Sequence, residues 1–294
     1  MLVALIGDVH GRIFHAIAAL ATLQARMGAK FDLLIQVGDL GYPELDRADA
    51  PTRLYLAIDP AEADLSRFLR PDIHCSAALR SIRESFACPI YFVRGNHEDF
   101  SWLAGLPVDP ATRTAPTDPF DLLHYVPDGT VLDRAGSRVA FLGGVEEQTG
   151  EAAIDMDAYR ALIGLGAGAI DLLVTHEGPY GSSTGYRGDV HGSRLMSRLL
   201  EALEPQWHVF GHAHSLEGPR IFGRTTYLGL DGLVASPRWQ PHALGLQPGC
   251  LGILDTTKKE LSAVTDEWLR DFPTPFIFDD WAASPDGLCR LGPS

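Results

Sequence analysis

The sequence has few cysteines, and they are not spaced for a common cysteine function. Only four occur among 294 residues, at Cys75, Cys88, Cys250 and Cys289, and none belongs to a Cys-x-x-Cys pair. Disulfide frameworks and thiolate zinc sites both need closely patterned cysteines. We therefore expect reduced thiols and neither kind of crosslink.

Basic residues and long apolar runs are scarce as well. The 24 Lys and Arg are outnumbered by 38 Asp and Glu, which gives a formal net charge of −14. Binding of extended nucleic acid needs clustered basic side chains, so this partner is disfavoured, although a local basic pocket stays open. No apolar run has the length of a membrane span, and the run at residues 2–6 lacks the basic flank of a secretory signal. We expect a cytoplasmic protein with no membrane partner, and the oligomeric state is left open.

Hydrophobic residues make up 46% of the chain, enough for a full core. Apolar runs typical of buried strands occupy residues 2–6, 33–37, 90–93, 139–142, 172–175, 208–210, 227–230 and 251–254. Helical periodicity lies between several of them, notably from Ile13 to a stop at Gly28 and over residues 193–203 before Pro205. Strands that alternate with helices predict an α/β fold whose sheets are covered by helices.

Two stretches interrupt this alternation, and a tail follows it. Residues 41–88 contain four prolines among charged residues and predict an insertion of short helices, and residues 105–121 have a loop composition. We expect a single domain over residues 1–264 that carries this insertion at about 41–88. The C-terminal tail, residues 265–294, has five Trp and Phe among acidic residues. We expect it to wrap on the body, with a contact between subunits as the alternative.

Polar motifs follow five of the apolar runs. They are Gly7-Asp8-Val9-His10-Gly11, Gly38-Asp39-Leu40-Gly41, Gly95-Asn96-His97-Glu98, Thr175-His176-Glu177 and Gly211-His212-Ala213-His214. Open α/β sheets bind ligands at the carboxyl ends of their strands, and glycines permit the tight turns that bring distant side chains together. On extended backbone, both side chains of Asp-x-His or His-x-His would point to one side. We therefore expect one shared site.

Seven side chains of these motifs form a set of oxygen and nitrogen donors: Asp8, His10, Asp39, Asn96, His176, His212 and His214. Such donors suit Mn²⁺, Fe or Zn²⁺ better than Ca²⁺ or Cu⁺. Seven exceed what one ion needs, whereas two ions that share a bridging carboxylate would use them all. Paired ions of this kind commonly serve the hydrolysis of phosphate esters.

The five motifs, in this order, resemble the calcineurin-like metallophosphoesterase superfamily over residues 8–214. The resemblance implies a four-layer αββα sandwich of two mixed β-sheets flanked by helices. It implies that Asp8, His10, Asp39 and His214 hold one divalent metal ion, that Asp39, Asn96, His176 and His212 hold another, and that Asp39 bridges them. His97 would be the catalytic histidine. Mn²⁺ is the metal expected first, with Fe or Zn²⁺ as alternatives.

The activity implied by this resemblance is metal-dependent hydrolysis of a phosphate ester. A metal-bridging hydroxide would attack phosphorus while His97 protonates the leaving oxygen or stabilises its charge. A phosphodiesterase or phosphatase acting on a small or nucleotide-type substrate fits best, and the sequence does not choose between monoester and diester.

Three alternatives stay open. Protein phosphatases and dinucleoside polyphosphatases share the Asp8 and Asn96 motifs but follow the bridging Asp with Asp-Arg-Gly, whereas Asp39 is followed by Leu40-Gly41-Tyr42-Pro43. The carboxylate expected to orient His97 is thus missing from its place. The stretch that ends in Gly211-His212-Ala213-His214 also loosely resembles the RNA lariat debranching enzyme, a nuclease. That enzyme has Cys at the position of Asp8, and a nuclease should show a basic surface, whereas this chain is acidic. A metal-bound interaction protein without activity is the third alternative.

Substrate contacts outside the metals are assigned to four residues. Arg12 and Arg94 flank two of the motifs, and a guanidinium matches phosphate through paired hydrogen bonds. Tyr180 and His191 belong to the Gly-rich stretch between residues 178 and 192. Glu98 follows the expected catalytic His97, and Glu177 follows the expected ligand His176. Both are assigned either to hydrogen bonds that support the metal site or to the plain surface.

Overall fold

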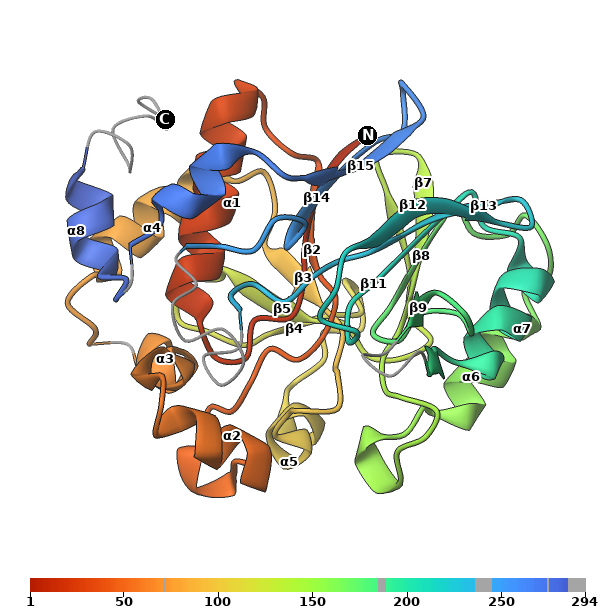
Figure 1. Ribbon diagram of the computed structural model, residues 1–294, viewed down its shortest axis with the longest axis horizontal. Coiled ribbons are helices and arrows are strands. Elements are labelled where there is room, and N and C mark those ends of the chain that lie inside the picture. Colours follow the sequence, from red (N-terminus) through yellow and green to blue (C-terminus); the bar gives the residue numbers. More distant parts are fainter. Residues whose placement is uncertain (71, 185–188, 236–244, 274, 285–294) are drawn as a thin grey trace.

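The computed structural model describes residues 1–70, 72–184, 189–235, 245–273 and 275–284. Two large β-sheets pack face to face, and helices cover their outer faces (Figure 1). The predicted four-layer αββα sandwich is therefore confirmed. Within the described ranges, no helix is both long and apolar enough to cross a bilayer.

The first sheet has seven strands in the order β15-β14-β1-β2-β3-β5-β4. Their bounds are β1 Leu2–Ile6, β2 Leu33–Gln36, β3 Ile90–Phe92, β4 Ala115–Pro116, β5 Leu123–Tyr125, β14 Leu251–Asp255 and β15 Glu260–Val264. Strands β1, β2, β3 and β5 are parallel, and antiparallel neighbours close both sides. The carboxyl ends of the parallel strands therefore lie at one edge.

The second sheet has six strands in the order β12-β13-β11-β8-β7-β6. Their bounds are β6 Val131–Arg134, β7 Ser137–Leu142, β8 Leu172–Thr175, β11 Trp207–Phe210, β12 Glu217–Phe222 and β13 Thr225–Gly229. Its four central strands, β13, β11, β8 and β7, are parallel, while β12 and β6 are antiparallel edges. A separate ribbon pairs β9 (Ser183–Thr184) with β10 (Val190–His191).

Strand alternation divides the apolar residues between three cores. In β1, Val3 and Leu5 point into the core between the sheets, whereas Ala4 and Ile6 point toward the helices. In β7, Val139 likewise faces the other sheet and Ala140 faces the helical layer. Because both faces of these strands are buried, their sequences are continuous apolar runs, which explains why all eight predicted strands are present.

Helices complete the outer layers. On the first sheet they are α1 Ile13–Met27, α3 Asp64–Phe68, α4 Ser76–Ser85 and α8 Phe278–Ala283; on the second, α6 Met156–Ile163 and α7 Arg194–Leu203. Helix α1 is followed by Gly28, the predicted stop. Gly28 has a φ of 61°, the left-handed conformation that is common at the C-cap of a helix. Helix α7 begins after Ser193, whose hydroxyl caps the amide of Met196.

The segment 41–88 contains short helices, as its composition indicates. It holds α2 (Ala50–Leu56), α3 and α4, with 3₁₀ turns at Leu45–Arg47 and Pro60–Ala63. The Asp49 carboxylate caps α2 and the Asp59 carboxylate caps the second turn, each with a proline in the first turn. The stretch 105–121 is largely irregular but is not loop throughout, because Ala115–Pro116 pair with β5.

The described part of the C-terminal tail packs on the first helical layer. Trp268, Phe272 and Phe278 are buried in the apolar cluster around α1, and the Phe278 ring lies 5.2 Å from that of Phe14. The remaining elements are α5 (Phe100–Gly105) and 3₁₀ turns at Gly150–Ala152 and Glu267–Asp271. Among the described residues the cysteines Cys75, Cys88 and Cys250 are free thiols, and Cys289 lies outside that range.

Candidate metal centre

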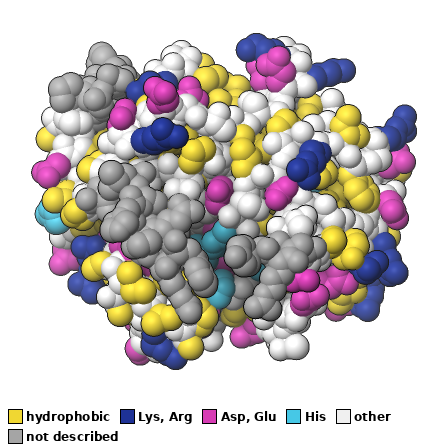
Figure 2. Space-filling model, viewed as in Figure 1, with side chains coloured by type: hydrophobic (Ala, Val, Ile, Leu, Met, Phe, Trp, Pro, Cys, Tyr) yellow, Lys and Arg dark blue, Asp and Glu magenta, His cyan; other side chains and the backbone are white. Residues whose placement is uncertain are grey.

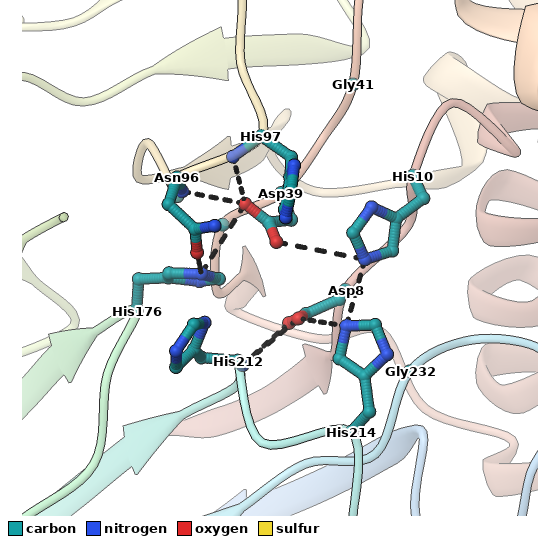
Figure 3. Close-up of polar contacts among 12 residues, drawn as sticks. Asp8, His10, Asp39, Gly41, Asn96, His97, His176, His212, His214 and Gly232 are labelled. Carbon is teal, nitrogen blue, oxygen red and sulfur yellow. Dashed lines mark hydrogen bonds and ion pairs between the residues drawn. The ribbon is translucent and has the colours of Figure 1, made fainter. Parts of the chain in front are cut away.

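The five predicted motifs come together where the two sheets meet (Figure 3). They follow β1, β2 and β3 of the first sheet and β8 and β11 of the second, so both sheets contribute their carboxyl edges. All seven predicted metal ligands lie around this point: Asp8, His10, Asp39, Asn96, His176, His212 and His214. Residues that are two hundred positions apart in sequence are therefore within contact distance.

One group of donors consists of Asp8, His10, Asp39 and His214, whose ligand atoms all lie within 4.8 Å of one another. The Nε2 atoms of His10 and His214 are 2.9 Å apart. The Asp8 Oδ2 is 3.1 Å from the His214 Nε2, and the Asp39 Oδ2 is 3.7 Å from the His10 Nε2. Two imidazole nitrogens and two carboxylates thus face a single point.

A second group consists of Asp39, His176 and His212, again within 4.8 Å. The His176 Nε2 lies 3.4 Å from the Asp39 Oδ1 and 3.0 Å from the Asn96 Oδ1, which adds the predicted amide donor. The other ring nitrogen of His176 contacts the carbonyl of Val37 at 2.9 Å. A proton on Nδ1 would be donated to that carbonyl, leaving the Nε2 lone pair for a cation.

The pKa shifts of three of the donors favour cation binding, whereas the pKa of His214 is raised, because its hydrogen bond to Asp8 and the nearby carboxylates outweigh burial. Burial lowers the pKa of His10 to about 3 and that of His212 to about 4, so both rings are neutral at pH 7. Burial alone would raise the pKa of Asp39, but the neighbouring His176 and His10 rings hold it well below its ordinary value. Neutral imidazoles and ionised carboxylates are the forms that ligate a divalent ion, so the donor set fits one.

The backbone at the ligands is unusual. His10, Asp39, His212 and His214 have φ angles of 46°, 56°, 65° and 45°. Non-glycine residues in this left-handed region cost about 1 kcal/mol or more each and concentrate at functional sites. The expectation that Asp-x-His and His-x-His lie on extended backbone is therefore wrong: tight turns, not strand alternation, aim these side chains at one point.

Two glycines are required by close packing against the ligands. A Cβ at Gly95 would lie 2.0 Å from the Asp39 Oδ1, and one at Gly211 would lie 2.1 Å from the Asp8 Oδ1. The same carboxylates accept backbone hydrogen bonds: Asp39 from Asn96 and His97 at 2.8 Å each, and Asp8 from His212 at 3.0 Å. The glycines therefore let one motif approach and fix the carboxylate of another.

His97 has a carboxylate partner that the sequence did not reveal. Its Nδ1 is 2.5 Å from the Asp49 Oδ2, at the start of α2 in the segment 41–88. Burial disfavours the charged ring, but the hydrogen bond to Asp49 and the charge of Asp39 raise the pKa of His97 to about 9. The carboxylate missing after Asp39 is thus supplied ten residues later by Asp49, which also caps α2.

Glu98 holds two of the ligand loops together. Its buried carboxylate accepts hydrogen bonds from the amides of Leu40 at 2.8 Å and of Gly41 and Gly95 at 3.2 Å. Glu177 accepts one from the amide of Glu146 at 2.8 Å. Both side chains therefore support loops, and neither is a plain surface acid.

Arg12 and Arg94 form ion pairs with carboxylates of the same chain. Arg12 is only 4% exposed and forms ion pairs of 2.9 Å with Asp59 and with Glu62. Arg94 pairs with Asp128 at 2.7 Å and donates to the carbonyl of Ala153. Both guanidinium groups thus have partners within the chain, and their assignment to substrate phosphate stays a prediction.

Tyr180 and His191 line a cavity next to the metal centre. The cavity encloses about 580 Å³, and its wall includes His212, one of the proposed ligands. Figure 2 shows histidine side chains near the middle of this face with acidic side chains beside them. One proposed ligand of the second group, His212, therefore borders a space large enough for an organic group.

Comparisons with known proteins agree with this geometry. Residues 1–216 match the family described as calcineurin-like phosphoesterase. A stretch of 58 residues is 31% identical to the UPF0046 protein K07C11.7 of Caenorhabditis elegans, a match that spans 20% of this chain and 20% of that protein. The chain thus covers about a fifth of that curated relative's length.

Solved structures resemble the whole sandwich. The crystal structure of the protein TT1561 of Thermus thermophilus aligns with 90% of this chain and 98% of its own at 13% identity and a TM-score of 0.51. A phosphatase of Mycoplasma pneumoniae aligns with 90% of this chain and 92% of its own at 15% identity and a TM-score of 0.43. At 13% identity, the likeness to TT1561 shows the fold alone.

Proposed function

The chain belongs to the calcineurin-like phosphoesterase family, and from this premise we propose that it hydrolyses phosphate esters with the help of two divalent metal ions. Asp8, His10, Asp39 and His214 would hold one ion, and Asp39, Asn96, His176 and His212 the other. The observation that carries the proposal is that two separate groups of ligand atoms share one carboxylate, Asp39. Mn²⁺ is the ion we propose for both positions, with Fe or Zn²⁺ as alternatives, in a cytoplasmic protein.

The metals, when bound, would neutralise phosphate oxygens and lower the pKa of a water molecule so that it becomes a nucleophile near pH 7. The residues of the chain supply the rest. Backbone amides of Asn96 and His97 fix the Asp39 carboxylate, and the amide of His212 fixes that of Asp8. These hydrogen bonds would hold the two carboxylates in position before substrate arrives.

His97 is the proposed proton donor to the leaving oxygen. Because its hydrogen bond to Asp49 favours the charged ring, the imidazolium is the main form at pH 7. An Nδ1 proton donated to Asp49 leaves the proton on Nε2 for the alkoxide that departs from phosphorus. Asp49 would thus position the ring and stabilise its charge without touching substrate.

The experiment is an assay with p-nitrophenyl phosphate and bis-p-nitrophenyl phosphate across Mn²⁺, Fe²⁺ and Zn²⁺. We expect hydrolysis that is lost on chelation and returns with metal, and the two substrates distinguish a monoesterase from a diesterase. His97→Ala should lower kcat by about 10²-fold or more while the protein keeps its metal content. Hydrolysis that survives chelation, or a His97 variant that loses its metals, would contradict the assigned roles.

A further inference from the structure

The cavity that His212 helps to line is a second candidate binding region, next to the proposed metal ligands. It is bounded on one side by the loop after β11, including His212 and Ser215, and on the other by Tyr180, His191 and Arg194. Its 580 Å³ exceeds the space that a phosphate group needs and lies within the usual range for small-molecule sites. A phosphate bound at the metals would therefore have room for an organic substituent on this side.

Tyr180 provides an aromatic side chain in the lining of that cavity. The guanidinium of Arg194 lies 4.1 Å from the centre of its ring, yet 42% of the residue is exposed. Its amide donates to the carbonyl of Ser193 at 2.9 Å and to the hydroxyl of Ser197 at 3.0 Å. The backbone of Tyr180 is thus anchored by two hydrogen bonds, and the Arg194 guanidinium packs on its ring.

The charge of the lining distinguishes between ligands. Among the described residues of the lining, Glu146, Glu147 and Glu177 contribute three carboxylates, against one guanidinium from Arg194. Glu146 is committed to Ser193 and to the amide of Leu195, and Glu177 to the amide of Glu146. A second anionic group in the cavity would meet these carboxylates at close range, whereas a neutral ring with donor groups would not.

We propose that this cavity binds an uncharged, planar ring carried by the alcohol portion of the substrate, stacked on Tyr180. The substrate class is then a phosphate ester of a nucleoside-sized, neutral alcohol, and a polyphosphate or a phosphorylated protein chain is disfavoured. This inference rests on the proposed function, because the ring is placed by a phosphate at the metal centre. It adds which part of the substrate the enzyme recognises.

The test measures inhibition of p-nitrophenyl ester hydrolysis by neutral leaving groups, at substrate concentrations well below KM. Adenosine should inhibit the wild-type enzyme, and ribose, which lacks the ring, should do so at least tenfold more weakly. Tyr180→Ala should raise the inhibition constant of adenosine by about tenfold or more, the usual effect of losing base stacking. Tyr180→Phe keeps the ring and should leave that constant within about twofold.

Uridine and orotidine test the charge of the cavity, because orotidine is uridine with a ring carboxylate. Orotidine should inhibit at least tenfold more weakly than uridine. Equal inhibition by adenosine and ribose, an unchanged adenosine constant in Tyr180→Ala, or equal inhibition by uridine and orotidine would overturn the inference. These results would overturn the inference while the enzyme still hydrolyses p-nitrophenyl esters. Failure of the proposed function is different, because the protein would then hydrolyse no ester with any metal.

Discussion

The contact between His97 and Asp49 leads to a sharp prediction. Asp49→Asn removes one negative charge 2.5 Å from the His97 Nδ1 but keeps an oxygen that can cap α2. A hydrogen bond between charged groups contributes roughly 1.5–3 kcal/mol, so kcat should fall by about 10- to 100-fold. Since Asn is among the preferred N-caps, the melting temperature should change little.

The pH dependence gives this prediction a direction. Asp49 helps raise the pKa of His97 to about 9, so the charged ring persists at neutral pH in the wild-type protein. Without Asp49, burial lowers that pKa, and the acid form is lost at a lower pH. The alkaline limb of the kcat profile should therefore move to lower pH, and the variant should be least impaired in mildly acidic buffer.

The assay is a pH–rate profile of four proteins: wild type, Asp49→Asn, His97→Ala and the double variant. In the His97→Ala background the Asp49 substitution should have little further effect, because the two residues act as a unit. Asp46→Asn is the matched control, since Asp46 is an exposed acid in the same segment. Wild-type kcat and pH profile in Asp49→Asn, or equal losses in both backgrounds, would refute the role assigned to Asp49.

Three further predictions follow from the packing. Gly211→Ala places a Cβ 2.1 Å from the Asp8 Oδ1 and should displace this proposed ligand. Metal titrations should therefore show at least tenfold weaker Mn²⁺ binding, and an unaltered Mn²⁺ affinity would contradict the close packing. Asp39→Asn should reduce bound metal below two ions per chain and activity by about 10³-fold or more, since the negative charge at both groups of ligands is weakened. Two ions per chain by elemental analysis of this variant would contradict the proposal that both metals share Asp39. Arg12→Met leaves the buried Glu62 without its ion pair, so unfolding in urea should show a loss of stability of about 3–5 kcal/mol, with KM unchanged. A raised KM without a loss of stability would instead assign Arg12 to substrate binding.

Much of the fold was predictable because the central strands are buried on both faces. Their continuous apolar runs stand out in the sequence, as in β1 and β8. The edge strands β6 and β12 were missed because they are partly exposed and mix polar with apolar residues. Strand β5 has three residues, as β3 does, but His124 interrupts its apolar run.

The metal ligands were predictable for a different reason. Each lies in a short motif after a strand, and the shape of the fold brings those strand ends together. Asp49 and Arg12 could not be assigned in this way, because their partners come from other segments. His97 lies 48 residues from Asp49, and Asp59 and Glu62 lie about as far from Arg12. No local pattern in residues 41–88 indicates which carboxylate faces the metal centre and which neutralises a buried arginine.

The most direct test of the central claim is anomalous scattering from a crystal of the wild-type protein grown or soaked with Mn²⁺. The account predicts two peaks about 3.5–4 Å apart, with the Asp39 carboxylate between them, Asp8, His10 and His214 around one, and Asn96, His176 and His212 around the other. A single peak, or manganese bound without Asp39, would contradict it.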